Sequence, residues 1–409
     1  MYFASYRIHP SSERITNMKR MYFVLDSAFP RDGAISNYIQ YLALCAQKSG
    51  FATIVLSARN DEFVAKEKPV YKNIVIKEIS LSRKRLVQKI QLRSGFAYRR
   101  IKILKEELIG RQDVVVAVSR NEEFLKALFR LRRKRHFKIV GTVLELFARE
   151  DFDGDQGEVR YLAYKKILDN YVTQFDLILP ISTLIQDYYR EKGCKTFLIP
   201  IMADNDEYQI KEKRFDKCRM IIPAMGKMKD ALSLMIKSYM ALDQKERDRT
   251  ELHLCGIKKE QIAQILSEEE LSVFSQSAVF HKWMKYDELV ELYQSMHFLL
   301  LARDDCQMTR ANFPSKVPEV MTYGVVPIVS DVGDYTTFYL ENNVNSLFFP
   351  NLDVETCADI IRSAIDMHYD VYMNFSKAAR KCVKEKFDYR NWVKPFGDAI
   401  SEIQKEERG

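Results

Sequence analysis

The stretch Asn312–Asp331 carries residues whose types and spacing suit the binding of an anion next to sugar hydroxyl groups. It reads NFPSKVPEVMTYGVVPIVSD, in which Pro314 and Ser315 favour the start of a helix and Glu319 falls in its first turns. Backbone N–H groups at a helix N-terminus have no partner within the helix and attract anions. A carboxylate beside them can accept hydrogen bonds from two ribose hydroxyls. The alternative is a surface helix that begins with a serine cap and carries an exposed glutamate.

A second candidate is the glycine–lysine segment that follows the predicted strand Arg219–Ile222. Gly226 allows a ligand to approach the backbone closely, and Lys227 and Lys229 can present positive charge to a phosphate. Such turns are common, so the segment alone is a weak signal. Its position matters more, because it belongs to the same predicted sheet as the stretch around Glu319. We therefore expect both segments to face one ligand.

The elements that must position these residues alternate between strands and helices. An apolar strand, a glycine turn and an amphipathic helix ending at Gly50 begin the pattern, which is typical of a doubly wound parallel sheet. The strands predicted in this first half are Met21–Leu25, Ala52–Leu56, Ile74–Ile79, Val114–Val118, Ile139–Leu144 and Leu177–Ile181. The alternation restarts at Arg219 and continues to the helix Tyr389–Lys405. In the second half the predicted strands are Arg219–Ile222, Leu252–Cys255, Ala278–His281, Phe298–Ala302 and the apolar run after Gly324.

The length of 409 residues also favours two domains. We predict an α/β protein with two tandem Rossmann-like domains, a cleft between them and a C-terminal crossover helix. The predicted parts are a leader at 1–17, a first domain at 18–204, a second domain at 218–387 and, at 388–409, a helix that returns to the first domain. Ligands of such sheets bind at the carboxyl ends of the strands, which here face the cleft.

Composition narrows the class of protein. Apolar residues make up 47% and charged residues 29% of the chain, as in soluble globular proteins, and no run approaches ~18 apolar residues. The N-terminal 17 residues lack the apolar core of a signal peptide. The seven cysteines are scattered without a CxxC pair, which indicates reduced thiols in a cytoplasmic protein.

The net charge of +8 is unevenly distributed. Segment 83–105 contains nine Lys or Arg residues and no acidic residue, and segment 126–138 is also strongly basic. Apolar residues alternate with these charges, so amphipathic helices are expected. Their basic faces could lie on an anionic membrane surface, bind nucleic acid or simply be solvated. The alternation favours the membrane, and no nucleic-acid recognition motif accompanies the charge.

With these motifs in place, the sequence from Arg20 to Lys405 resembles the GT-B-fold glycosyltransferases of family 4, the group 1 glycosyltransferases. The turn at Gly33 is similar to the family's first-domain glycine turn. Gly226, Lys227 and Lys229 resemble the Gly-Arg…Lys-Gly motif that holds the donor diphosphate, with Asp230 in place of the final glycine.

The most specific family signal is a Glu-x7-Glu segment that leads into a G-x-P-V/I strand. Glu319, Gly324 and the strand after it match its second half. The first Glu would stand at position 311, where this chain has Ala311. The segment Pro314–Lys316 resembles a variant branch that reads Pro-Ser/Thr-Lys-x-x-Glu. The missing Glu affects recognition of the donor sugar, a role for which Asp304 or Asp305 could substitute.

The resemblance implies a transferase of the hexosyltransferase type that uses a nucleotide-sugar donor, retains the anomeric configuration and needs no metal or other cofactor. Lys229 and the helix end formed by Ser315, Lys316 and Val317 are then expected to bind the leaving diphosphate. The resemblance assigns Glu319 to the ribose and His281 to the neighbourhood of the base.

On the acceptor side, Glu145 follows the predicted strand Ile139–Leu144 and should point into the cleft. It is a candidate acceptor-binding residue or base, although a strand-terminal glutamate can also be purely structural. The segment Asp151–Asp155 contains a DxD pattern and the opening of a calcium loop. Gln156 and Leu162 stand where that loop needs glycine and glutamate, so no metal site is predicted. We expect an acidic loop near the acceptor face.

The sequence thus predicts a cytoplasmic, peripherally membrane-associated glycosyltransferase. Its partners would be a nucleotide-sugar, a glycan acceptor that is lipid-linked and belongs to a cell-surface or capsular polysaccharide, and an anionic membrane surface contacted by segments 83–105 and 126–138. The alternative is a catalytically silent relative that binds glycans or another enzyme, which the absent first Glu favours.

Overall fold

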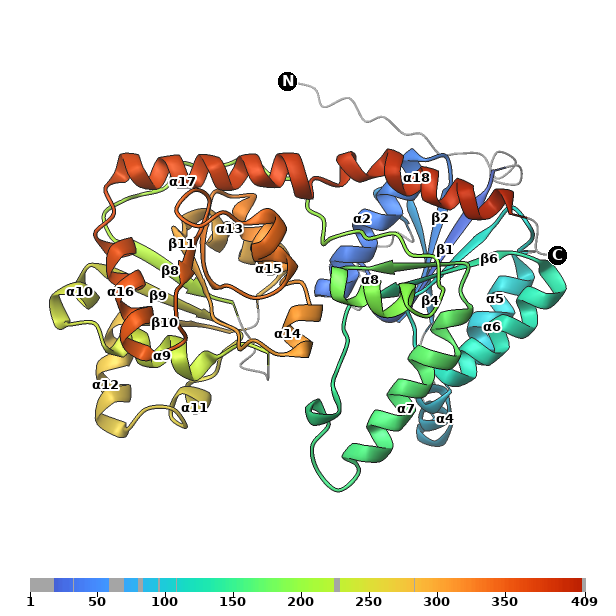
Figure 1. Ribbon diagram of the computed structural model, residues 1–409, viewed down its shortest axis with the longest axis horizontal. Coiled ribbons are helices and arrows are strands. Elements are labelled where there is room, and N and C mark those ends of the chain that lie inside the picture. Colours follow the sequence, from blue (N-terminus) through green and yellow to red (C-terminus); the bar gives the residue numbers. More distant parts are fainter. Residues whose placement is uncertain are drawn as a thin grey trace.

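The computed structural model contains two α/β domains connected by a short linker and by a long C-terminal helical segment (Figure 1). The residues that it describes are 18–31, 33–58, 70–79, 84–94, 96–107, 109–223, 229–282 and 284–406. The predicted leader, 1–17, lies outside them. The predicted fold class, two Rossmann-like domains with parallel sheets, is confirmed.

The first domain is built on a seven-stranded sheet of order β3-β4-β2-β1-β5-β6-β7. All neighbours pair in parallel except the short β3, which is antiparallel to β4. The central strand has Met21 to Leu25 fully buried, as expected for a strand covered on both faces. The strands are β1 (Arg20–Ala28), β2 (Ala52–Ala58), β3 (Val70–Tyr71), β4 (Ile74–Ile79), β5 (Val114–Ala117), β6 (Lys138–Val143) and β7 (Leu177–Pro180).

Helices cover both faces of this sheet (Figure 1). They are α2 (Ala34–Lys48), α4 (Arg85–Arg93), α5 (Ala97–Glu106), α6 (Glu122–Arg135), α7 (Gly157–Asn170) and α8 (Thr183–Arg190), with single 3-10 turns at Arg149–Asp151 and Val172–Gln174. Asn121 and Ser182 cap the start of α6 and α8 by accepting hydrogen bonds from backbone N–H groups. Gly33 precedes α2 with φ 90°, a conformation that favours glycine.

The second domain is a six-stranded, wholly parallel sheet of order β10-β9-β8-β11-β12-β13. Its strands are β8 (Cys218–Ile222), β9 (Thr250–Cys255), β10 (Ala278–His281), β11 (Phe298–Leu301), β12 (Val326–Ser330) and β13 (Leu347–Phe349). Its helices are α9 (Leu232–Met240), α10 (Gln244–Asp248), α11 (Lys259–Ile262), α12 (Glu268–Ser277), α13 (Tyr286–Ser295), α14 (Gln307–Ala311), α15 (Lys316–Met321) and α16 (Val354–Ile365), with a π-helical turn at Tyr335–Tyr339.

The C-terminal segment joins the two domains along one side of the molecule. Helix α17 (Tyr369–Cys382) lies on the second domain, and after a π-helical turn at Val383–Phe387 helix α18 (Tyr389–Lys405) packs against α2 of the first (Figure 1). The rings of Tyr41 and Tyr389 stack at this contact with centroids 5.9 Å apart. The C-terminal segment thus contacts both domains and connects them along one side of the molecule.

The Asn312–Asp331 stretch folds largely as predicted, with one correction. Helix α15 begins after Ser315, and Gly324 ends the segment at φ 71° before the fully buried β12. A side chain at Gly324 would also collide with Ser376 Oγ. Ser315 occupies the N-cap position of α15, as predicted, but its φ and ψ are already helical and its side chain makes no capping hydrogen bond.

The two basic segments differ in how their apolar residues are placed. On α4, Leu86 and Ile90 are 72% and 60% exposed, whereas the apolar side chains of α6, including Leu125 and Leu128, are buried in the domain. Arg100 on α5 does not belong to any exposed basic face, because it is fully buried. Among the described residues of the two basic segments, α4 and Tyr98 at the start of α5 therefore present large apolar side chains together with basic ones.

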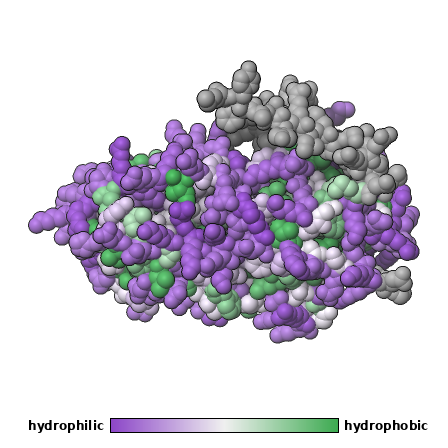
Figure 2. Space-filling model, turned by 90° about the horizontal axis from the view of Figure 1, so that it is seen from above, coloured by the Kyte–Doolittle hydropathy of each residue, from purple (hydrophilic) through white to green (hydrophobic). Residues whose placement is uncertain are grey.

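No helix in the described ranges is long and apolar enough to cross a membrane. The face that carries α17 and α18 is mostly hydrophilic, and the hydrophobic side chains visible on it lie in scattered spots (Figure 2).

Candidate active site

The carboxyl ends of the two sheets meet across a cleft that contains two adjoining hollows. The first-domain cavity has a volume of about 280 Å³ and is lined by Asp26, Ala34, Ile35, Val118, Arg120, Thr142, Leu144, Glu145, Ile181, Ile201, Asn312, Phe313 and Ser315. The second, here called the tyrosine pocket, is lined by Ala34, Asn37, Tyr38, Tyr41, Ile201–Asp204, Glu207, Tyr286, Ser315, Glu319, Thr322 and Tyr323. Ala34, Ile201 and Ser315 border both, so the two hollows are continuous.

Two of the predicted residues meet across the domain boundary. The ammonium of Lys229, just before α9, forms an ion pair with the carboxylate of Glu145, just after β6. Lys229 Nζ also lies 5.6 Å from the ring centroid of Phe147. Both side chains remain partly exposed, so a ligand entering the cleft can reach them. Glu145 was predicted to face the cleft because it follows a parallel strand, and Lys229 because it lies in the loop after the first strand of the second domain. In the structure the two side chains are in contact.

Behind this pair lies a buried group of charges that was only partly anticipated. The guanidinium of Arg303 donates to Asp230 at 3.0 Å and to Asn312 at 2.9 Å. Burial lowers the pKa of Lys316, while the carboxylate of Asp230 acts in the opposite direction. Sequence reasoning missed Arg303, although its position directly after a parallel strand was the signal that identified Glu145.

Glu319 lies in the tyrosine pocket, away from the Lys229–Glu145 pair. Burial raises its pKa to about 7, and the carboxylate of Glu207 adds to the rise, whereas Lys316 and a hydrogen bond from Tyr286 oppose it. Hydroxyl donors of a ligand would favour the ionised carboxylate. The residue is therefore poised to change its charge when it binds a polyol.

The rest of the predicted helix end contributes unequally. Ser315 lines both hollows. The side chain of Val317 is fully buried and its backbone N–H already donates to the carbonyl of Pro314 at 3.0 Å. Within this segment Ser315 and Glu319 line the hollows, whereas Lys316 lines neither of them.

Three further predicted residues are placed differently. Gly33 stands at the start of α2, next to Ala34, which borders both hollows. Gly226 and Lys227 lie outside the described residues. His281 does not line either hollow; its ring stacks on that of His253 with Nε2 2.9 Å from Nδ1.

Ala311 stands where the resemblance places the first Glu of the Glu-x7-Glu segment. Ala311 is fully buried, and its carbonyl accepts a hydrogen bond from Ser182 Oγ of the first domain at 2.8 Å. Asp305 is paired with Arg310 at the surface and neither it nor Asp304 lines the two hollows. The proposed substitution by these aspartates gains no support from their placement.

The acidic loop of the first domain is organised by aromatic packing. Phe152 lies against Phe147 and Tyr164, and Asp151 accepts a hydrogen bond from the backbone of Ala148 at 2.7 Å. Among the described residues, no cluster of three or more His, Cys, Asp or Glu side chains could hold a metal ion.

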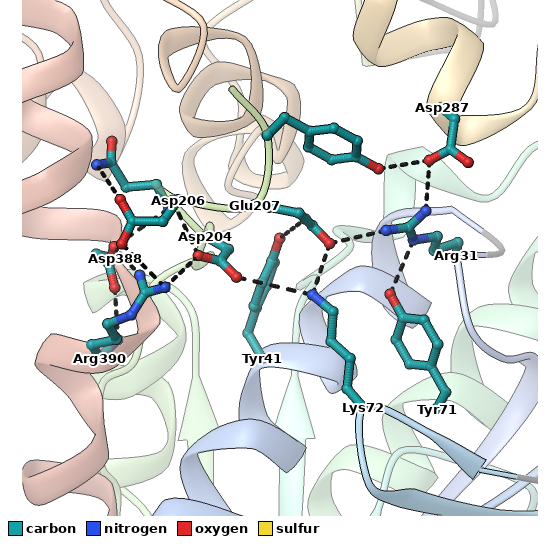
Figure 3. A network of polar contacts seen from close by, with 12 residues as sticks. Arg31, Tyr41, Tyr71, Lys72, Asp204, Asp206, Glu207, Asp287, Asp388 and Arg390 are labelled. Atoms are coloured by element: carbon teal, nitrogen blue, oxygen red, sulfur yellow. Dashed lines mark hydrogen bonds and ion pairs between the residues drawn. The ribbon is translucent and has the colours of Figure 1, made fainter. Parts of the chain in front are cut away.

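At the hinge end of the cleft, the linker between the domains is held by a dense ionic network (Figure 3). Arg31, from the turn before α2, donates to Glu207 at 2.9 Å, to Asp287 at 2.7 Å and to Tyr71 at 3.0 Å. Lys72 also donates to Glu207, at 2.7 Å. Because Asp287 belongs to α13, Arg31 ties the first domain, the linker and the second domain together.

The same network reaches the crossover helix. Arg390 of α18 forms ion pairs with Asp388 at 2.7 Å and with the linker residue Asp204 at 2.8 Å (Figure 3). The linker is therefore held from both sides, by the first domain and by the segment that returns to it.

Comparison with known proteins agrees with this architecture. Residues 206–382 match the family described as "Glycosyl transferases group 1". The matched segment runs from the linker to the end of the C-terminal helix α17, so it covers the second domain and is similar to that family. A search of curated protein sequences finds no significant match.

Solved structures resemble the whole two-domain chain. A glycosyltransferase from Rickettsia africae has 13% identity and a TM-score of 0.68, over 96% of this chain and 100% of its own. The Anabaena protein HepE, in complex with UDP-glucose, has 12% identity and a TM-score of 0.68, over 94% and 100%. TarM from S. aureus, in complex with UDP and alpha-GlcNAc-glycerol, has 10% identity and a TM-score of 0.70, over 95% and 100%. At these identities the likeness shows the two-domain GT-B fold alone.

Proposed function

We propose that this protein transfers a sugar from a nucleotide-sugar donor to a glycan acceptor. The observation that carries the proposal is the Lys229–Glu145 pair, which sets a cation of the group 1 domain against a carboxylate of the first domain across the cleft. The donor complex of the structurally similar HepE supports a nucleotide-sugar as the ligand class.

In this proposal the bond between the anomeric carbon and the diphosphate oxygen breaks, and the growing negative charge on the diphosphate is received by Lys229 and Lys316. Groups placed where charge develops lower the barrier most, by about 3 kcal/mol for one donor at comparable oxyanion sites. Glu319 binds the ribose hydroxyls. The reaction needs no metal ion, retains the anomeric configuration and transfers a hexosyl group.

The ion pair also suggests an order of events. A diphosphate in the cleft competes with Glu145 for the ammonium of Lys229. Once Lys229 has turned to the phosphate, the Glu145 carboxylate is free to accept a hydrogen bond from the acceptor hydroxyl. Donor binding thereby prepares the acceptor side of the cleft.

The acceptor is proposed to be lipid-linked, as in polysaccharide assembly at the cytoplasmic face of a membrane. Support comes from α4, where Leu86 and Ile90 are exposed beside Arg85 and Lys89. Basic and apolar side chains on one exposed helix suit an anionic lipid surface. Helix α6 buries its apolar residues, so α4 is the element that we expect to insert.

Vesicle binding tests the membrane part. Arg85→Glu with Lys89→Glu should weaken binding to phosphatidylserine-containing vesicles by at least about thirtyfold, since each basic residue near the surface contributes about 1 kcal/mol. The matched change on α6, Arg133→Glu with Lys134→Glu, should have a smaller effect. Equal effects of the two pairs would contradict the role given to α4.

A catalytically silent protein is the second candidate. It is favoured by Ala311, whose buried position and contact with Ser182 leave no carboxylate where the family places its first Glu. Such a protein would still bind the donor through Lys229 and Glu319.

A panel of nucleotide-sugars separates the two candidates. Thermal shift first identifies the donors that stabilise the native state, and hydrolysis or transfer of the sugar is then measured. If the protein is an enzyme, the wild type transfers or hydrolyses the sugar. The variant Lys229→Ala should then lose activity, and the exposed control Lys259→Ala should keep it. Stabilisation without turnover would identify the silent protein, and full activity in Lys229→Ala would remove the proposed site.

A further inference from the structure

Two carboxylates and one arginine line the first-domain cavity, and both carboxylates are already paired with cations that do not line it. Asp26, directly after the core of β1, and Glu145, directly after β6, both line it. Each already has a cation: Asp26 is bound by Arg100 at 2.8 Å, and Glu145 is bound by Lys229. Arg120, which follows β5, lines the same cavity and forms no hydrogen bond or ion pair with any residue in the described part of the chain.

The carboxylate of Asp26 is held in place from within the domain. Arg100 is fully buried and donates to Asp26 at 2.8 Å and to Ser119 at 3.0 Å, and it also donates to the backbone carbonyl of Leu25. Its guanidinium lies 5.3 Å from the ring centroid of Phe124. One buried side chain thus fixes both Asp26 and the loop Ser119–Arg120. The ends of β1 and β5 are thereby held in one arrangement facing the cavity.

The surroundings of Arg120 differ from those of an ordinary solvated surface arginine. It is half-buried, it stands next to a loop fixed by Arg100, and apolar side chains such as Val118 and Ile181 form the wall beside it. Thr142, on the neighbouring strand, also lines the cavity and its buried hydroxyl has no hydrogen-bond partner within the described residues. Arginine in such surroundings is suited to bind a carboxylate or phosphate through two parallel hydrogen bonds.

We propose that the first-domain cavity binds an anionic acceptor, with Arg120 as the counter-ion of its oxyanion and Asp26 as the acceptor of one of its hydroxyl hydrogen bonds. The proposal rests on the proposed sugar transfer and states the chemistry of the molecule that receives the sugar. The oxyanion is either a phosphate or the carboxylate of a uronic acid, since both match the guanidinium.

Binding of three simple sugars tests this without any turnover. The probes are methyl α-glucoside, glucose 6-phosphate and glucuronic acid, and their dissociation constants are measured by ligand-observed NMR on the full chain. The wild type should bind at least one anionic probe about tenfold more tightly than the neutral one, as expected for a hydrogen-bonded charge pair. The probe that gains identifies phosphate or carboxylate as the source of the charge.

Variants locate the preference. Arg120→Gln should bind all three probes equally, Arg120→Lys should keep part of the preference, and the exposed control Arg130→Gln should behave as the wild type. Lys316→Ala reports on anions held at the donor side instead. The proposal is overturned if the wild type shows no preference, if Arg120→Gln keeps it, or if Lys316→Ala alone removes it. A chain that shows the preference but transfers no sugar would refute the proposed function and leave the anion site standing.

Discussion

The two ends of the cleft join the domains in very different ways. At the hinge end, the linker carboxylate of Glu207 is shared by Arg31, Lys72 and Tyr41, and its side chain is only 8% exposed. At the open end, a single ion pair joins Glu145 to Lys229, and both remain partly exposed. The hinge network is redundant and is centred on a buried carboxylate, so it holds the domains together. At the open end, the Lys229–Glu145 ion pair is a partly exposed contact that a charged ligand can exchange.

The difference predicts that losing one charged group affects mainly activity at the open end and mainly stability at the hinge. Lys316→Ala at the open end should lower the rate of sugar transfer about 100-fold, since one oxyanion donor is worth about 3 kcal/mol. Stability should change little, because Lys316 has no ion pair within the described residues and its burial already lowers its pKa. Transfer kinetics and urea unfolding of the same preparations measure both quantities. An unfolded variant, or one with normal transfer, would contradict the assignment.

The matching change at the hinge is Glu207→Gln. Removing the carboxylate leaves Arg31 with Asp287 and deprives Lys72 of its close partner. We expect a loss of about 3 kcal/mol in the free energy of unfolding, the lower end of the values for broken buried pairs. Asp366→Asn is the control, since its pair with Arg249 is exposed on both sides and should matter by less than about 1 kcal/mol. Equal losses in the two variants would show that the buried carboxylate of Glu207 contributes no more to stability than an exposed ion pair does.

Glu319 interacts electrostatically with a charged residue at each end of the cleft, Lys316 at the open end and Glu207 at the hinge. Its pKa is about 7 in the folded protein and 4.5 ordinarily, so between these values the unfolded chain releases its proton first. Stability should therefore fall by about 1–2 kcal/mol as the pH rises from 4.5 to 7, a value discounted because the side chain is only partly shielded from water. Glu319→Gln should flatten that dependence.

The same residue gives donor binding a pH dependence of opposite sign. Ribose hydroxyls prefer the ionised carboxylate, so donor affinity in the wild type should be higher at pH 8 than at pH 6. Calorimetry at the two values checks this, with Glu319→Gln as the variant that should lose the difference. A wild-type affinity that does not vary with pH would remove Glu319 from the donor site.

The sequence predicted most of this frame because periodicity and breaker residues are local signals. The helix Tyr389–Lys405 begins and ends as predicted, and the buried parallel strands stand out as apolar runs. The short strands β3 and β13 were missed, since two or three residues give no periodic pattern. Ser315 was correctly placed at the start of α15, but its residue type could not show that its side chain makes no capping hydrogen bond.

The site was predictable to the extent that one rule was applied consistently. The rule that side chains after parallel strands face the ligand identified Glu145, and it would also have singled out Asp26, Arg120 and Arg303. Contacts between distant segments had no such signal. Arg31 and Glu207 are 176 positions apart, and their pairing depends on how two folded domains meet. Arg100 was grouped with the exposed basic residues because charge alone does not reveal burial.

The smallest expected effect is the sharpest test of redundancy at the hinge. Lys72→Ala removes one cation from Glu207, but Arg31 and the hydroxyl of Tyr41 remain bound to the carboxylate. The free energy of unfolding should therefore fall by less than about 1 kcal/mol. Arg31→Gln alone should cost more, and the double variant should cost more than the sum, because only then is the buried carboxylate left without a cation. Additive losses in urea unfolding would mean that the two cations act independently, and the contrast between a shared hinge network and an exchangeable open end would fail.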